Sequence, residues 1–147
     1  MSRLTRFLNF FRINKSIAID LVTSNVLIYD KQKNKIVLNE PSVIVKNRKT
    51  GEIVAVGKEA KEMEGKTAES TVVIRPLTEG VISDIDATRE MLSAFIRQIY
   101  GGSPFRPELM VCVPIEMTSI EKKAIFDAAI GAKKIYLLEE GKAAVVG

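Results

Sequence analysis

Hydrophobic side chains in the first 15 residues recur at the spacing of a helix. The apolar positions that follow the i, i+3, i+4, i+7 pattern of one helical face are Leu4, Phe7, Leu8 and Phe11. Arg3 and Arg6 lie at the borders of this face, beside the bulky apolar side chains. Such an arrangement is typical of a helix that lies in a membrane interface, so residues 1–15 are predicted to form an amphipathic membrane-associating helix.

The segment has two other interpretations. A signal peptide is disfavoured because Asn9 and Arg12 interrupt the apolar stretch it would need, and no small-residue cleavage site follows. A helix that packs on its own domain, or on a partner protein, remains an alternative.

From Ser16 onward the pattern changes to short β-rich runs that later alternate with helical periodicity. Strands are predicted at residues 17–21, 26–29, 35–38, 42–45, 52–56, 72–74, 109–113 and 135–138. Asn39-Glu40-Pro41 is predicted to break the strand pattern after residue 38. Helices are predicted at residues 58–63, 86–100 and 118–130, the last of them with Thr118 and Glu121 as a capping box, and a further helix starts at 141–147. This order predicts one α/β domain over residues 16–147 with a mixed sheet, and a small β-rich subdomain inserted at about residues 39–67.

Composition narrows the class of protein. With 147 residues and 46% hydrophobic content, the chain can bury one sizeable core. Its 22 Lys and Arg exceed its 18 Asp and Glu, but the excess is confined to the first 16 residues, which argues against nucleic acid as a partner. The longest apolar runs fall short of the ~18 residues that a membrane span requires.

The residue inventory excludes several kinds of chemistry. Histidine is absent, which removes Ser-His-Asp catalysis and every metal site that needs an imidazole. The single cysteine, Cys112, lies in an apolar run and is predicted to be a buried small hydrophobe. One unpaired cysteine is compatible with a reducing cytoplasm.

The turn that follows the first strand is the best candidate for chemistry. Asp20 ends the strand, and Thr23, Ser24 and Asn25 follow it. A carboxylate beside hydroxyls and exposed backbone N–H groups can hold a hydrated divalent cation together with phosphate oxygens. The same residue types are common in any β-hairpin turn, which leaves a purely structural role open.

Acidic and basic residues elsewhere have structural alternatives. Glu139 and Glu140 follow a buried strand, where a carboxylate could orient a water molecule, or could instead stabilise a helix N-terminus. Arg75 and Asp84 flank a turn and are interpreted as a structural salt link.

Several segments, in order and in register, resemble the MreB family of rod-shape-determining bacterial relatives of actin. The matching segments are Ile19-Asp20-Leu21 with Thr23 and Asn25, residues 36–43, residues 55–57, Ile74-Arg75-Pro76, residues 111–114, and Glu139-Glu140. The resemblance implies the first lobe of an actin-like, ribonuclease H-like fold. It also implies an ATP-dependent filament protein that lies under the inner membrane and guides cell-wall synthesis.

The resemblance further assigns roles to residues. ATP with magnesium is the implied cofactor, with Asp20 positioning the metal through water. Thr23, Ser24 and Asn25 would contact phosphate, and Glu140 would activate the attacking water. The implied partners are the chain itself or full-length MreB in filaments, the inner membrane surface, and the wall-elongation machinery, at the cytoplasmic face of the membrane.

Departures from the family pattern lower the expected activity. Val22 stands where the family has glycine, and a β-branched residue obstructs close approach of the backbone to phosphate. Gly141-Lys142 replaces the family's Pro-Met, and the sequence stops where a second lobe would begin. We therefore expect weak nucleotide binding and almost no ATP hydrolysis by this chain; the alternatives are a non-enzymatic filament-binding or capping protein, or a non-functional gene fragment.

Overall fold

The computed structural model describes residues 16–21, 24–66, 68–78, 80–101, 108–114, 116–129 and 134–139. The predicted helices at residues 1–15 and 141–147 lie outside this set. The elements in chain order are β1 (Ser16–Asp20), β2 (Asn25–Asp30), β3 (Lys35–Pro41), β4 (Ile44–Asn47), β5 (Ile53–Val56), α2 (Lys58–Met63), β6 (Thr71–Ile74), β7 (Leu77–Thr78), β8 (Val81–Ile82), α3 (Ile85–Tyr100), β9 (Glu108–Val113), α4 (Ser119–Ala128) and β10 (Lys134–Glu139).

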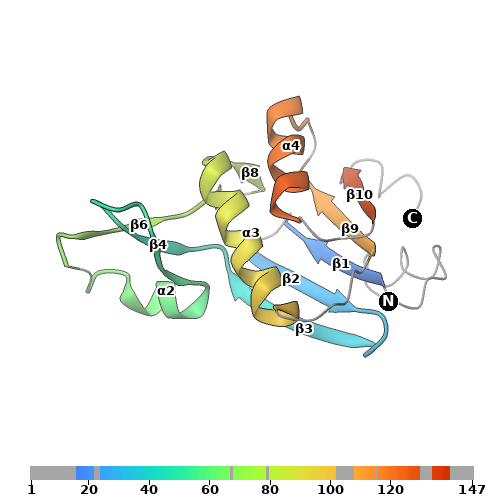
Figure 1. Cartoon of the computed structure of the whole chain (residues 1–147), viewed down its shortest axis with the longest axis horizontal. Helices are drawn as coiled ribbons and strands as arrows, with labels where there is room; N and C mark the ends of the chain where they lie inside the picture. The colour runs from blue at the N-terminus through green and yellow to red at the C-terminus, as the bar shows by residue number, and fades with distance from the viewer. Residues whose placement is uncertain are drawn as a thin grey trace.

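A five-stranded mixed sheet organises the structure, as the sequence predicted. Its strand order is β10-β9-β1-β2-β3. Strands β1, β9 and β10 run parallel, whereas β2 pairs antiparallel with both β1 and β3. Helices α3 and α4 lie together over one face of this sheet (Figure 1).

Strand β3 continues to Pro41, past the residues predicted to break it. The sequence Asn39-Glu40-Pro41 resembles a strand terminator, yet all three residues pair with β2. A proline is tolerated there because β3 is an edge strand, on which the missing N–H costs no ladder hydrogen bond.

A second, smaller sheet lies to one side of the main sheet (Figure 1). Its strand order is β5-β4-β6, and with α2 it encloses a separate small core of Val43, Val45, Ala55 and Ala60. The insertion predicted at about residues 39–67 differs from this in extent, because β6 pairs with β4 and carries the small sheet on to Ile74. The local pattern shows that β6 is a strand but does not show which strand it pairs with.

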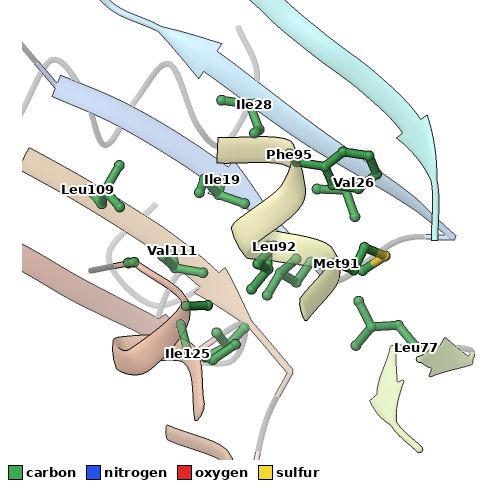
Figure 2. Close-up of a cluster of buried hydrophobic side chains, with 14 of the residues drawn as sticks. Ile19, Val26, Ile28, Leu77, Met91, Leu92, Phe95, Leu109, Val111 and Ile125 are labelled. Carbon is green, nitrogen blue, oxygen red and sulfur yellow. The ribbon is translucent and has the colours of Figure 1, made fainter. Parts of the chain in front are cut away.

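The main core forms between the sheet and the two helices that cover it. Figure 2 shows Met91, Leu92 and Phe95 of α3 together with Ile19 and Val111 of the sheet. Phe95 is completely buried, as is Met91. Every second residue of β1 and β9 points into this core, which explains the apolar runs in the sequence.

The opposite face of the sheet carries a smaller apolar cluster. Ala18, Met110 and Cys112 are buried there, and Tyr136 and Leu138 pack against them. Cys112 is 1% exposed, which confirms its predicted role as a buried small hydrophobe.

The helix ends follow signals in the sequence. Thr118 and Glu121 form the predicted capping box at the start of α4. The Asp84 carboxylate accepts a hydrogen bond from the Ala87 N–H and so caps α3.

Arg75 makes the predicted structural salt bridge, but its partner is Glu64, at 2.7 Å, rather than Asp84. Within the described residues, none of the helices combines the length and apolar character needed to cross a membrane.

A buried polar contact ties the end of α3 to the end of β2. The Tyr100 hydroxyl donates to Asp30 Oδ2 at 3.0 Å, and the Lys33 N–H donates to Asp30 Oδ1 at 3.2 Å. Asp30 is only 5% exposed. Burial, and then the neighbouring Asp30 carboxylate, raise the pKa of the Tyr100 phenol well above its usual range.

We expect Tyr100→Phe to destabilise the protein at neutral pH by about 1–3 kcal/mol, because a buried carboxylate oxygen loses its donor. The unfolded phenol ionises at about pH 10. Since the folded pKa is higher, the stability that the phenol contributes is complete below pH ~10 and declines as the pH rises further. Urea unfolding of both proteins between neutral and alkaline pH should show the difference between them shrinking above pH ~10. A difference that stays constant with pH would contradict this assignment. So would a neutral-pH cost no larger than that of Tyr29→Phe on β2, where the lost hydroxyl donates to the exposed side chain of Asn34.

Candidate functional site

The carboxyl ends of three parallel strands meet at one edge of the main sheet. Strand β1 ends there at Asp20, β9 at Val113 and β10 at Glu139. In open α/β sheets, ligands bind at the carboxyl ends of parallel strands, where chain turns away from the sheet expose backbone groups and side chains. Asp20 therefore ends its strand at the edge where ligands generally bind in such sheets.

Asp20 lies at this edge, on the sheet face opposite α3. Its Cα is in register with Cys112 on β9 and with Leu27 on β2. Because side chains alternate along a strand, Asp20 shares its face with Ala18 and not with the core residue Ile19. The side chain is half-buried, at the rim of the smaller apolar cluster.

The hairpin between β1 and β2 is held on both sides by backbone hydrogen bonds. The Leu21 N–H donates to the Cys112 carbonyl at 3.0 Å, and the Ser42 N–H donates to the Ser24 carbonyl at 3.1 Å. Ser24 is exposed. Val22 and Thr23 lie outside the described residues, so the predicted phosphate role of Thr23 and the obstruction by Val22 stay predictions.

Asn25, the first residue of β2, meets a second asparagine that the sequence analysis did not select. Its Nδ2 donates to Asn39 Oδ1 at 2.8 Å. Asn39 lies on β3, opposite Leu27 in the register, and its side chain is exposed. The structure thus gathers Asp20, Asn25 and Asn39 on one face of the sheet, at the same end.

The two acidic residues at the end of β10 do not share one role. Glu139 continues the alternation of Ile135 and Leu137, which pack on the core that α3 and α4 cover. Its carboxylate forms an ion pair with Lys122 of α4 at 3.4 Å, and so links β10 to the helix layer. Glu140 lies outside the described residues, and its assignment to the attacking water stays a prediction.

The side chains described at this edge fit a magnesium nucleotide. Among the described residues, no group of three or more acidic or cysteine side chains is arranged to hold a metal ion. Magnesium keeps several waters and is commonly held by one or two carboxylates together with substrate phosphates. One carboxylate, Asp20, beside the amides of Asn25 and Asn39 fits that mode of binding.

A surface hollow of about 520 Å³ lies elsewhere, on the outer side of α3. It is lined by residues of α3 with Ile53 of β5 and Asp127 of α4, and by none of the predicted site residues. Its lining combines Arg89 and Arg97 with the acidic side chains of Glu90 and Asp127.

The mixed sheet order, the small inserted sheet and the polar carboxyl edge define an actin-like lobe, and solved actin-like structures match it. MreB5 of Spiroplasma citri bound to AMPPNP superposes with a TM-score of 0.71 at 32% identity, covering 89% of this chain and 40% of that one. A MamK double helical filament matches with a TM-score of 0.65 at 20% identity over 85% of this chain and 41% of that one, a likeness of fold alone.

The chain belongs to the MreB/Mbl family, whose model, described as MreB/Mbl protein, matches residues 14–147. The cell shape-determining protein Mbl of Bacillus cereus is 48% identical over 136 residues, which is 90% of this chain and 40% of that protein. The cell shape-determining protein MreB of Haemophilus influenzae is 46% identical over 142 residues, or 91% of this chain and 40% of its own length. The chain thus spans about 40% of the length of these curated relatives.

Proposed function

We propose that this chain acts in the bacterial cell-shape cytoskeleton, as the first, nucleotide-binding lobe of an MreB-like filament protein that guides cell-wall synthesis. Membership of the MreB/Mbl family supports this, because the similar curated relatives are named cell shape-determining proteins. The proposed partners are further copies of the chain or full-length MreB, and the wall-elongation machinery.

The carboxyl edge of β1, β9 and β10 is the proposed site for ATP with magnesium. Asp20 would orient a water molecule on the metal, while Thr23, Ser24 and Asn25 would donate hydrogen bonds to phosphate oxygens. Bound magnesium ATP would supply the phosphoryl group and the charge that these residues must position. The observation that carries this proposal is that Asp20, Asn25 and Asn39 share one face at the ligand-binding end of the sheet.

Glu140 is the proposed activator of the attacking water. Of the two adjacent carboxylates, Glu139 is engaged by Lys122 on the helix side of the sheet. This structural role of Glu139 favours the second carboxylate for the proposed catalytic role. Efficient hydrolysis would still require phosphates, metal and water to be positioned together.

The first 15 residues are proposed to place the protein at the inner face of the cell membrane. The apolar stripe formed by Leu4, Phe7, Leu8 and Phe11, bordered by Arg3 and Arg6, supports interfacial binding. Ordering a short helix costs much of the free energy that burying these apolar side chains in the membrane contributes. One copy should therefore bind weakly, and many copies joined in a filament should bind firmly.

Amide NMR can test the proposed nucleotide site. We expect millimolar magnesium ADP to shift the backbone amides of Leu21, Ser24, Asn25 and Asn39, and to leave those of Ser93 and Arg97 in the α3 hollow unchanged. Chelating the magnesium should reverse most of the shifts, since the metal joins Asp20 to the phosphates. Shifts confined to the α3 hollow, or no shifts at the sheet edge at millimolar nucleotide, would contradict the proposed site.

A further inference from the structure

Asn39 occupies a position in the sheet that its place in the sequence does not reveal. The register aligns Asp20, Leu27 and Asn39 in one row across β1, β2 and β3. Asn25 lies on the same face, two residues before Leu27 and nearer the hairpin. On this face of β3, Asn39 is therefore the polar residue nearest in register to the proposed phosphate site.

The contact between the two asparagines is a direct side-chain hydrogen bond. Asn25 Nδ2 donates to Asn39 Oδ1 at 2.8 Å, a normal hydrogen-bond length. Because Asn39 accepts this hydrogen bond, it restricts rotation of the Asn25 amide group. Asn25 is one of the residues predicted from the sequence to contact phosphate.

The residues that follow Asn39 are anchored. Glu40 Oε2 accepts a hydrogen bond from the Lys58 N–H at 2.7 Å, which fastens β3 to the start of α2. Gly57 permits this approach, because a Cβ at that position would lie 2.5 Å from the same Glu40 oxygen. Ser42 is held by its N–H bond to the Ser24 carbonyl and by a contact of its hydroxyl with Met91 Sδ at 3.6 Å.

These contacts fix the backbone that follows Asn39. Glu40 fastens the end of β3 to α2, and Ser42 fastens the next segment to the hairpin. A displacement of this end of β3 would have to break one of these bonds. The Asn39 side chain is itself exposed, and its hydrogen bond with Asn25 joins it to β2.

We propose that Asn39 is a positioning residue for phosphate binding, which acts by orienting the Asn25 side chain. This inference rests on the proposed function, since it deepens the same nucleotide site. Asn39 acts through Asn25 and need not touch the phosphate itself.

The test uses the full 147-residue chain, with magnesium ADP as the ligand. We expect Asn39→Ala to shift the side-chain amide resonance of Asn25 and to raise the Kd for magnesium ADP about fivefold, the effect of losing one hydrogen bond of ordinary strength. Asn39→Asp keeps an acceptor oxygen and should restore the Asn25 resonance. Asn47→Ala is the matched control, because Asn47 Oδ1 also accepts hydrogen bonds, from the Lys49 and Thr50 N–H groups, but lies in the small sheet. It should alter neither readout.

The outcomes separate this inference from the proposed function. An unchanged Asn25 resonance in Asn39→Ala would overturn the inference, as would a wild-type Kd in that variant. A fivefold loss in Asn47→Ala as well would overturn it, because the effect would then be one of general stability. Absence of magnesium ADP binding by the wild-type chain would overturn the proposed function and, with it, this inference.

Discussion

Replacing Phe7 and Phe11 with glutamate should abolish binding of the chain to vesicles that contain the anionic lipid phosphatidylglycerol. Each phenylalanine that leaves water contributes about 1.5–3 kcal/mol, so losing two lowers the affinity by on the order of 100-fold or more. The introduced carboxylates add repulsion from the anionic surface, where each cation contributes about 1 kcal/mol. Co-sedimentation with vesicles measures this loss directly.

The opposite side of the same predicted helix offers a matched control. Thr5 and Asn9 fall away from the apolar stripe, so Thr5→Glu with Asn9→Glu adds the same charge without removing an apolar side chain. This variant should retain part of its binding, reduced only by electrostatics. Equal binding by all three proteins would refute the interfacial helix. Equal loss in both variants would show that charge alone, and not the apolar stripe, governs binding.

The second large effect is expected in the main core. Phe95 is fully buried between α3 and the sheet. Phe95→Ala should lower the free energy of unfolding by about 3–5 kcal/mol, because it removes buried apolar surface and leaves a cavity. Small domains are stable by only ~5–15 kcal/mol, so the variant should be close to unfolding.

Urea unfolding followed by circular dichroism measures this change. Gln98→Ala, on the exposed side of the same helix, is the control and should change stability by less than about 0.5 kcal/mol. A loss below about 1 kcal/mol in Phe95→Ala would mean that the core between α3 and the sheet does not hold the lobe together.

Much of the fold was predictable because its signals are local. Helix α3 was expected from the periodic spacing of Met91, Leu92 and Phe95, and β9 from a continuous apolar run. The capping box of Thr118 and Glu121 marked the start of α4. Each of these signals lies within one helix or strand and does not depend on the segments that pack against it.

Features that depend on pairing between distant segments could not be predicted from local sequence patterns. The pattern of residues 71–74 identifies a strand, but only the register with β4 assigns it to the small sheet. Likewise, Pro41 looked like a strand terminator, and the edge position of β3 that accommodates it is a property of the assembled sheet.

The candidate site shows the same division. Asp20 and Asn25 were selected because a carboxylate and polar residues beside a turn suggest phosphate chemistry. Asn39 was missed, since an asparagine before Glu-Pro carries no such signal until the sheet register brings it to Asn25. Glu139 and Glu140 were indistinguishable in sequence, and the contact with Lys122 gives the first of them a structural role.

The central claim is that the carboxyl edge of the parallel strands, where Asp20 ends β1, binds a magnesium nucleotide. The most direct measurement repeats the amide NMR titration with magnesium ADP on Asp20→Asn, which keeps the size of the side chain and removes its charge. The account predicts that this variant folds normally but loses the magnesium-dependent part of the shifts at Ser24 and Asn25. Magnesium-dependent shifts of wild-type size in Asp20→Asn would contradict it.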